Sequence, residues 1–135
     1  MLSVKGLQAG YGSAIVIRGV DLTLGKGETL ALVGRNGMGK TTFLKAMLGY
    51  LPNTKGTVMI AGHEVQGWPT SRIVRRGVAY APQEEAIFGD LTVAENLEAN
   101  MAGHAHSPVR RKTVLDYFPI LQQRLRQHAG TLSGG

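Results

Sequence analysis

The sequence lacks cysteine altogether and has no long run of apolar residues. Without cysteine, neither a disulfide framework nor a thiolate metal site is available, and the four histidines show no metal-ligand spacing. A membrane-spanning helix needs about 18 consecutive apolar residues, so no such helix is expected. The first residues also lack the charged and apolar regions of a secretory signal, and a cytosolic location is therefore expected.

Acidic residues are too few to balance the basic ones: 9 Asp and Glu stand against 15 Lys and Arg, a net charge of +6 over 135 residues. Such an excess is typical of proteins that bind nucleic acid, an anionic membrane face or a polyphosphate ligand. The two basic clusters, 72–76 and 110–112, fall in helical patterns and are not interleaved with aromatic residues. Stacking on single-stranded nucleic acid is not indicated, and no nucleic-acid partner is expected.

One stretch carries a specific chemical signal, because residues 34–41 spell G-x-x-x-x-G-K-T. The loop comprises Gly34, Arg35, Asn36, Gly37, Met38, Gly39, Lys40, Thr41 and Thr42. It follows an apolar run at 29–33, which predicts a buried strand, and precedes apolar residues at helical spacing over 43–51. Strand, glycine loop and helix form the context in which this motif binds the phosphates of a nucleotide.

The residue types of the loop match the needs of phosphate binding. Gly34, Gly37 and Gly39 allow left-handed backbone angles, so that successive N–H groups can converge on phosphate oxygens. The following helix adds the positive end of its dipole and its unpaired first-turn donors. Lys40 is expected to reach the β and γ phosphates, and the Thr41 hydroxyl is expected to bind Mg²⁺.

Further strands are indicated on both sides of the loop. Alternating apolar residues at 20–24 predict an N-terminal β hairpin or meander, and 57–61 predicts another strand. The run 78–81 predicts a buried strand that Pro82 stops, since proline cannot donate to a ladder. Gln83 is thereby placed at the end of a strand.

Three helix starts are marked by residues that cap or pre-shape a first turn. They predict a short helix from Pro69 to Gly77, a helix from Thr92 to about Met101 and a helix from Ser107 towards Phe118. Thr92 and Glu95 have the spacing of a capping box. The later part of the chain is therefore expected to be helical.

The glycine loop, Gln83 and the final Leu132, Ser133, Gly134 and Gly135, in this order, resemble the ATP-binding cassette (ABC) ATPases that drive membrane transporters. The resemblance covers essentially the whole chain. It implies an α/β fold of the P-loop NTPase type, with an antiparallel β subdomain, an incomplete parallel core sheet and a helical subdomain. All three parts would belong to a single partial domain. The β subdomain would comprise 1–28 and 53–68, the P-loop core 29–52 and 69–83, and the helical subdomain 84–135.

The same resemblance implies roles for residues outside the loop. Tyr11 would stack on the adenine base, a contact worth roughly 1 to 3 kcal/mol. Gln83 would touch Mg²⁺ and the attacking water, sharing catalysis with Lys40, and would relay the nucleotide state to a transporter subunit. The signature residues 132–135 would grip the γ phosphate of ATP bound to a second ATPase subunit, which implies a head-to-tail dimer.

Finer features look most like the ATPases of branched-chain amino acid importers, and those of urea importers are similar enough to stay open. They include Phe118-Pro119 and the segments 87–97 and 129–135. The implied partners are membrane-spanning permease subunits, a second ATPase subunit and, indirectly, a periplasmic solute-binding protein. The protein would lie in the cytoplasm on the inner face of the membrane, held there by the permease. Met38 departs from the family, whose loops usually carry a small residue at this point.

Members of this family continue with a strand that ends in Asp and a catalytic Glu, and with a switch His, none of which is in this sequence. Phosphoryl transfer needs a positioned metal ion and an oriented water, so the 135 residues are expected to bind ATP and to hydrolyse it poorly. Two other functions stay open: a nucleotide-binding module without turnover, and a cassette protein that acts on DNA or ribosomes. The DNA-repair type is not favoured, because no coiled-coil heptads follow the loop.

Overall fold

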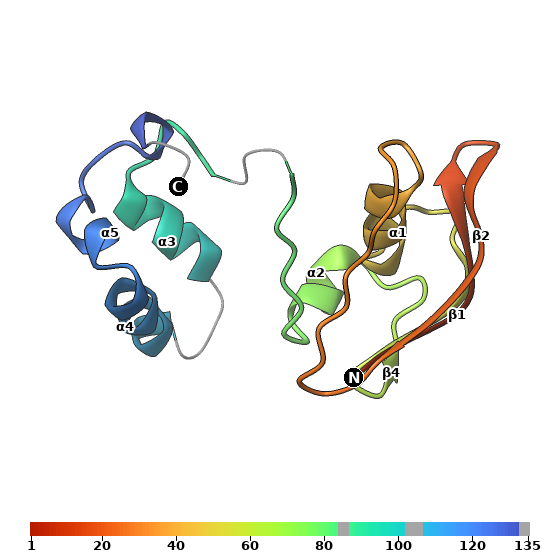
Figure 1. Cartoon of the computed structure of the whole chain (residues 1–135). Helices are drawn as coiled ribbons and strands as arrows, with labels where there is room; N and C mark the ends of the chain where they lie inside the picture. The colour runs from red at the N-terminus through yellow and green to blue at the C-terminus, as the bar shows by residue number, and fades with distance from the viewer. Residues whose placement is uncertain (84–86, 102–106, 133–135) are drawn as a thin grey trace. The chain divides into compact units, whose positions relative to one another are not determined.

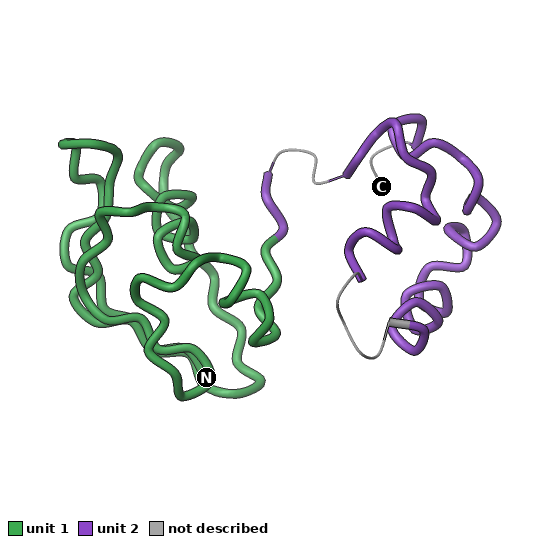
Figure 2. The backbone as a smooth tube through the Cα atoms, turned by 180° about the vertical axis from the view of Figure 1, so that it is seen from behind, with its two compact units in different colours: residues 1–80 green, residues 81–135 purple. Residues whose placement is uncertain are grey.

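The computed structural model describes residues 1–83, 87–101 and 107–132. Its backbone forms two compact units, residues 1–80 and residues 81–135 (Figure 2). Unit 1 contains the sheet and the glycine loop, and unit 2 contains helices. The two units also differ in charge, because unit 1 holds ten of the 15 basic residues and three of the nine acidic ones.

Unit 1 is built on a four-stranded antiparallel sheet with the strand order β2-β1-β3-β4. Its strands are β1 (Leu2–Tyr11), β2 (Ala14–Leu24), β3 (Lys55–Ile60) and β4 (His63–Glu64) (Figure 1). In the register, Leu2 of β1 faces Leu24 of β2 on one side and Ile60 of β3 on the other. The predicted N-terminal hairpin and the predicted strand near 57–61 are confirmed.

The β1–β2 hairpin closes through a two-residue turn, Gly12-Ser13, which sets Tyr11 opposite Ala14. Gly12 has a φ of 57°, a left-handed angle that glycine adopts without steric cost. Gly10 is required for another reason, because a Cβ on it would stand 1.8 Å from the Ala14 carbonyl oxygen. The turn therefore fixes where β2 begins and which face each of its side chains takes.

The core of unit 1 lies between the sheet and two helices, α1 (Lys40–Met47) and α2 (Thr70–Val74), which lie on the same side of the sheet (Figure 1). Leu7, Ile73, Val4 and Val58 are its most deeply buried side chains, each at most 1% exposed. Burying a side chain of this size contributes roughly 1.5 to 3 kcal/mol. Phe43 of α1 joins the same core, which holds the helix that follows the glycine loop against the sheet.

Helix α1 ends earlier than its apolar spacing predicts, since that spacing extends to Leu51. Gly49 takes a left-handed φ of 74°, and its N–H donates to the Ala46 carbonyl over 3.2 Å. The Tyr50 N–H donates to the Lys45 carbonyl over 3.0 Å. These two bonds form a Schellman motif, which ends the helix. Leu51 is still buried, so the periodicity located the core correctly although the helix stops before it.

Two predicted strands are missing from the sheet, and the parallel ladder expected from them is missing as well. The segments 29–33 and 78–81 have no strand pairing, and every ladder among the described residues is antiparallel. Leu30, Leu32 and Val33 are 49%, 41% and 85% exposed, where burial was expected. A parallel strand is held by neighbours along its edges and by helices on both faces, and neither segment has a strand neighbour in the described part of the chain.

Unit 2 contains α3 (Val93–Met101), α4 (Ser107–Tyr117), α5 (Pro119–Gln123) and the short 3₁₀ helix η1 (Ala129–Thr131). The predicted capping box is confirmed. The Thr92 N–H donates to Glu95 Oε2 over 2.8 Å, and the Glu95 N–H donates to Thr92 Oγ over 3.3 Å. Helix α4 begins at Ser107, as predicted, and Pro119 opens the helix that follows it.

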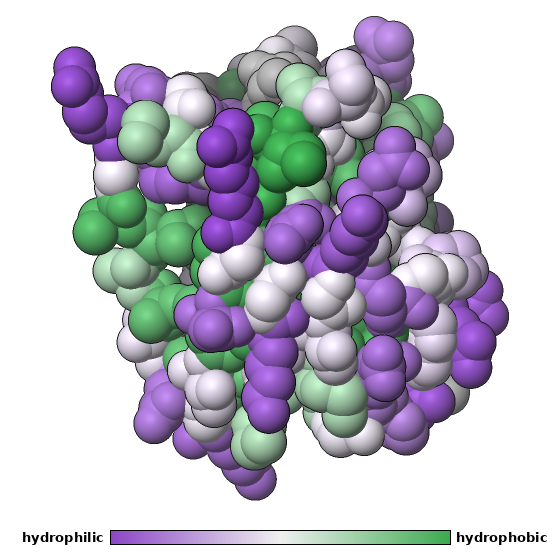
Figure 3. Space-filling model, turned by 90° about the vertical axis from the view of Figure 1, so that its right-hand side faces the viewer, coloured by the Kyte–Doolittle hydropathy of each residue, from purple (hydrophilic) through white to green (hydrophobic). Residues whose placement is uncertain are grey.

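No helix in the described ranges is long and apolar enough to cross a membrane. Seen from the hairpin side, hydrophobic side chains are interspersed among hydrophilic ones (Figure 3). Ile15 and Val16 of β2 are among the exposed apolar residues of unit 1. Val16 lies against the glycine loop, next to Gly39.

Candidate functional site

The glycine loop has the backbone that the sequence predicts for it. Gly34, Gly37 and Gly39 have φ angles of 154°, 81° and 90°, values at which a side chain would be strained. The loop leads directly into α1, whose N-cap is Gly39. Loop and helix start together bring several backbone N–H groups to one place, as the motif requires.

Lys40 is bound to the backbone of the loop that precedes it. Its Nζ donates to the carbonyl oxygens of Gly34 over 2.7 Å and Arg35 over 2.9 Å. An ammonium group has three donors, so one remains for another acceptor. The lysine side chain therefore folds back along the loop and brings a positive charge to the place where phosphate binding is predicted.

The first turn of α1 offers backbone donors without a capping side chain. The N–H of Phe43 makes the first helical bond, to the Gly39 carbonyl over 2.8 Å, and no side chain caps the N-terminus. The N–H groups of residues 40–42 precede that bond and have no partner within the helix. Together with the positive end of the helix dipole, they favour an anion that carries several oxygens.

Side chains of β2 support the loop from the other side, a contact that sequence reasoning missed. A Cβ built on Gly39 would stand 2.8 Å from Ile17 Cδ1 and 3.1 Å from Val16 Cγ1. Ile17 is buried in the core, whereas Val16 is 39% exposed. A side chain at Gly39 would therefore have to displace the side chains of Ile17 and Val16. The missing cue was the hairpin register, which decides where the β2 side chains point.

Tyr11 stands in the same unit, at the end of β1. The β1–β2 turn that follows it and the glycine loop lie at the same end of unit 1 (Figure 1). The Tyr11 side chain is 51% exposed and so has a ring surface free for stacking. Its contact with adenine stays a prediction.

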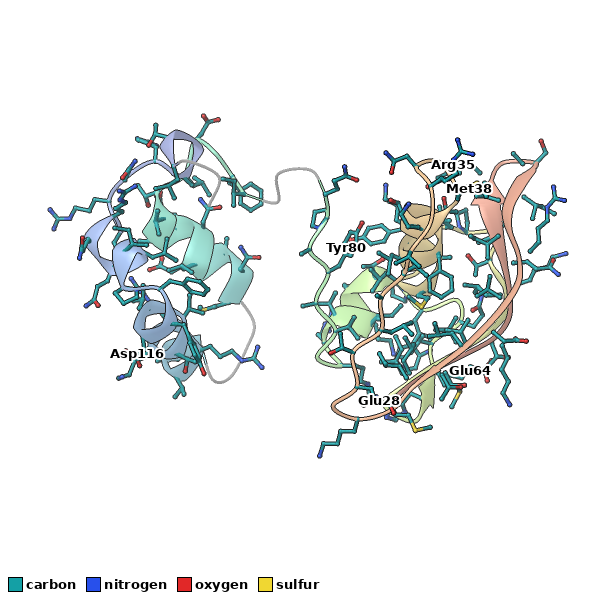
Figure 4. The ribbon with its side chains drawn as sticks, viewed as in Figure 1. Glu28, Arg35, Met38, Glu64, Tyr80 and Asp116 are labelled. Carbon is teal, nitrogen blue, oxygen red and sulfur yellow. The ribbon has the colours of Figure 1, made fainter. Side chains whose placement is uncertain are left out.

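Charges in unit 1 are distributed in favour of an anion at the loop. Arg35 and Met38 lie on the loop, whereas Glu28 and Glu64 lie at the opposite end of the unit (Figure 4). The third acidic residue of the unit, Asp21, accepts a hydrogen bond from the Gly6 N–H. A polyanion at the loop would therefore meet positive charge with little repulsion from carboxylates. Met38 is 70% exposed.

The other predicted site residues belong to unit 2. Gln83 is exposed, and Leu132 is half-buried directly after η1. Their approach to the loop stays a prediction. The remaining signature residues, Ser133, Gly134 and Gly135, lie outside the described residues.

The described residues contain no group of three or more His, Asp or Glu that could hold a metal ion. The predicted Mg²⁺ ligands are instead neutral oxygens, the exposed hydroxyl of Thr41 and the amide of Gln83. Mg²⁺ is commonly held by one or two carboxylates together with phosphates and waters, and neither predicted ligand is a carboxylate. The hydroxyl of Thr41 is nevertheless the group that a phosphate-binding loop supplies to a metal ion that arrives with a nucleotide.

The sequence that forms this site matches a known protein family. The profile of the ABC transporter family matches residues 17–135, which include the glycine loop, Gln83 and the signature segment. The chain belongs to the ABC transporter family. This result confirms the resemblance based on the loop, the glutamine and the final residues.

Curated relatives align with all or nearly all of the chain. The high-affinity branched-chain amino acid transport ATP-binding protein BraG of Pseudomonas aeruginosa is 36% identical over 137 residues, covering 100% of the chain and 59% of its own length. The probable branched-chain amino acid transport ATP-binding protein LivF of Archaeoglobus fulgidus is 37% identical and covers 100% and 58%. The Fe(3+) ions import ATP-binding protein FbpC 1 of Rhodococcus jostii is 33% identical and covers 99% and 39%. The chain thus spans less than two thirds of the length of these relatives.

Solved structures give the same fold. A structure described as the ATP-binding subunit of an ABC transporter superposes with a TM-score of 0.80 and 29% identity, covering 98% of this chain and 55% of its own. The antiparallel N-terminal sheet, the loop–helix unit and the helices of unit 2 agree with a P-loop ABC ATPase fold. The predicted fold class is confirmed at this level.

Proposed function

We propose that this chain is the ATP-binding part of an importer's ATPase subunit, which couples ATP binding and hydrolysis to solute transport across the cytoplasmic membrane. The observation that carries the proposal is the loop geometry, with the Lys40 ammonium on the loop carbonyls and uncapped N–H groups at the start of α1. A site of this kind takes the polyphosphate of a nucleotide. The solute we propose is a branched-chain amino acid or a similar small molecule.

The choice of solute rests on the names of two relatives, BraG and LivF. A third relative is an Fe(3+) ions import ATP-binding protein, so relatives of similar identity serve importers of different solutes. A urea-type importer is the alternative within the same class. The permease and solute-binding subunits make most contacts with a transported solute, so the described site bears on ATP rather than on the solute.

ATP would bind with its phosphates on the loop. Lys40 would donate to phosphate oxygens with its free donor, and would exchange one loop carbonyl for a second oxygen as the nucleotide enters. The N–H groups of residues 40–42 would donate to the same phosphates. Mg²⁺, held by Thr41 and Gln83, would neutralise charge that develops on the phosphates during transfer. Tyr11 would stack on the adenine.

The rest of the assembly is inferred from the family. Residues 132–135 would contact ATP on a second ATPase subunit in a head-to-tail dimer, so that each dimer has two shared sites. Membrane-spanning permease subunits would hold the dimer at the inner face of the membrane, and a periplasmic solute-binding protein would deliver the solute. Slow ATP hydrolysis by the 135 residues alone stays a prediction, as does the second function, a nucleotide-binding module without turnover.

A titration of the chain with ATP and Mg²⁺ tests the central claim. Replacing Lys40 with alanine removes a hydrogen bond to a charged group, so affinity is expected to fall by roughly 1.5 to 3 kcal/mol, about 10- to 150-fold. Lys45→Ala is the matched control, since Lys45 stands in the last turn of the same helix. Equal affinity in the Lys40 variant and the unaltered chain would refute phosphate binding at this loop.

A further inference from the structure

Unit 2 contains a buried polar side chain, Asn96 of α3, that binds the backbone of the loop in front of its own helix. The side chain is 7% exposed. Its Oδ1 accepts the Phe88 N–H over 2.8 Å, and its Nδ2 donates to the Phe88 carbonyl over 2.9 Å. Nδ2 also lies 3.0 Å from the Thr92 carbonyl and 3.3 Å from the Leu91 carbonyl. The amide therefore holds the chain from Phe88 to Thr92 in one conformation.

The segment held by Asn96 is hydrogen-bonded to a segment more than thirty residues further along the chain. The Val93 and Ala94 N–H groups donate to carbonyls of residues 127 and 125, each over 3.0 Å. In the other direction, the Ala129 N–H donates to the Leu91 carbonyl over 2.9 Å, and the Gly130 N–H donates to the Gly89 carbonyl over 3.0 Å. Residues 89–94 and 125–130 are thus joined by four backbone hydrogen bonds around a single antiparallel bridge, Thr92 with His128, and this group of bonds is called the ladder below.

Two further contacts lock this ladder. His128 Nδ1 lies 2.9 Å from the Asp90 carbonyl, and since a carbonyl only accepts, this ring nitrogen carries the proton and donates it. Gly89 and Gly130 lie against one another, so that a Cβ on Gly130 would stand 3.2 Å from the Gly89 Cα and carbonyl oxygen. A side chain at position 130 would therefore require the Gly89 backbone to shift by a few tenths of an ångström.

The ladder joins two places that matter to the proposed function. At one end, Ile87 and Phe88 are 47% and 59% exposed, in the segment that follows Gln83. At the other end, the ladder runs through η1 to Leu132, the first residue of the signature. Asn96 is hydrogen-bonded to Phe88 and Leu91, at the first of these two ends. Because these bonds fix the backbone of Phe88 and Leu91, they determine which N–H and carbonyl groups face residues 125–130.

We propose that Asn96 is a positioning residue that makes residues 87–94 and 125–132, which stand between Gln83 and Ser133 in the sequence, one rigid piece. A displacement of the backbone at Phe88, by a partner subunit or by nucleotide, would then be carried to Leu132 through the ladder. This inference rests on the proposed function, because that function gives Gln83 and Ser133 their roles. It assigns regulation of the ATP site to a buried amide that binds the backbone of residues 88–92.

Hydrogen exchange at single amides of the nucleotide-free chain tests whether the two segments move as one rigid piece. In Asn96→Asp, a carboxylate oxygen replaces Nδ2 and faces the carbonyls of Phe88, Leu91 and Thr92, so the turn is expected to be released. Exchange at the amides of Ala129 and Gly130 is expected to accelerate about tenfold or more. Asn100→Asp is the matched control, because Asn100 is exposed on the same helix and, among the described residues, donates only to the Asn96 carbonyl. In Asn100→Asp, the exchange rates of the Ala129 and Gly130 amides are expected to stay within about twofold of those in the unaltered chain. Unchanged exchange at Ala129 and Gly130 in Asn96→Asp would overturn the proposal.

A second pair of variants tests the same coupling from the other end and does not depend on a buried charge. Gly130→Ala crowds the Gly89 backbone, whereas Gly89→Ala brings its Cβ only to ordinary contact, 3.5 Å from Gly130 Cα. The Phe88 amide, which donates to Asn96, is expected to exchange faster in Gly130→Ala and to keep its rate in Gly89→Ala. If Gly130→Ala loosens residues 125–130 but leaves Phe88 protected, the two segments move independently and the proposal fails.

Nucleotide provides the readout that a merely structural role would not affect. MgATP is expected to change exchange in both 87–94 and 125–130 of the unaltered chain, and only in one of them in Asn96→Asp, while its dissociation constant stays within about twofold. A response confined to one segment of the unaltered chain would contradict the proposal. No binding of MgATP at all would contradict the proposed function instead, and the nucleotide-free experiments would still decide whether the two segments are one piece.

Discussion

Ile17 of the β hairpin touches the glycine loop at Gly39, where its Cδ1 stands 2.8 Å from the position that a Cβ would take. The contact joins residues 22 positions apart, and a side chain at Gly39 would have to displace Ile17 and Val16. The last glycine before Lys40 therefore matters for packing as well as for its backbone angle. Substitution at Gly39 is therefore expected to affect both folding and nucleotide binding.

In Gly39→Ala, the new methyl group must push Ile17 and Val16 aside and also accept a φ of 90°. We expect the free energy of unfolding to fall by about 1 to 3 kcal/mol, as measured by urea titration, and MgATP affinity to fall with it. Gly62→Ala separates the two causes, because Gly62 has a φ of 81° and no atom within 4 Å of its Cβ position. An equal loss of stability in both variants would show that the angle alone matters and that the Ile17 contact does not.

Part of this site is predictable from the sequence and part is not. The left-handed angles of Gly34, Gly37 and Gly39 follow from the motif, because only glycine adopts them without strain. The contact with Ile17 does not follow, since it depends on the hairpin register and on how the sheet packs against α1. Local chemistry was therefore predictable, and contacts between distant segments were not.

The same distinction explains the error at 29–33. Five apolar residues before a glycine loop have the composition of a buried strand, and the prediction rested on composition alone. A strand also needs neighbours with which to pair, and among the described residues Val33 has none and is 85% exposed. The capping box at Thr92 was predicted correctly for the opposite reason, because both of its partners lie within four residues of each other.

Tyr11 gives a second prediction, which concerns the base rather than the phosphates. Tyr11→Leu removes the ring, so MgATP affinity is expected to fall by roughly 1 to 3 kcal/mol in a nucleotide titration. Tyr11→Phe keeps the ring and is expected to bind within about twofold of the unaltered chain. If leucine and tyrosine give the same affinity, the base does not stack on this residue.

Thr41 gives a third prediction, which separates metal from nucleotide. Thr41→Val removes the hydroxyl, so the factor by which Mg²⁺ strengthens ATP binding is expected to fall about tenfold, with metal-free affinity unchanged. Thr41→Ser keeps the hydroxyl and is expected to retain the Mg²⁺ effect. ATP titrations with Mg²⁺ and with a chelator measure it directly. A full Mg²⁺ effect in the valine variant would remove Thr41 from the metal site.

The capping box gives the last prediction, a dependence of stability on pH. Hydrogen bonds from the side chain and the backbone N–H of Thr92 lower the pKa of Glu95 below its ordinary value of 4.5, and the charge of His128 acts in the same direction. A carboxylate with a lowered pKa stabilises the folded state above the pKa of the unfolded chain, and this contribution is lost as the pH falls through the lower, folded value. Between about pH 5 and pH 3, the unaltered chain is therefore expected to lose more stability than Glu95→Gln, which cannot titrate.

Glu98→Gln is the matched control for this measurement, because Glu98 lies on the same helix without a part in the capping box. Its ion pair with Arg111, 3.2 Å long, is partly exposed to solvent and of a kind that contributes little to stability. Thermal unfolding midpoints recorded across the pH range would give the slope for each protein. The control is expected to keep the slope of the unaltered chain, and Glu95→Gln to flatten it. Equal slopes in all three proteins would show that the box does not carry the acid sensitivity of α3, and that its hydrogen bonds form as readily with the protonated carboxyl.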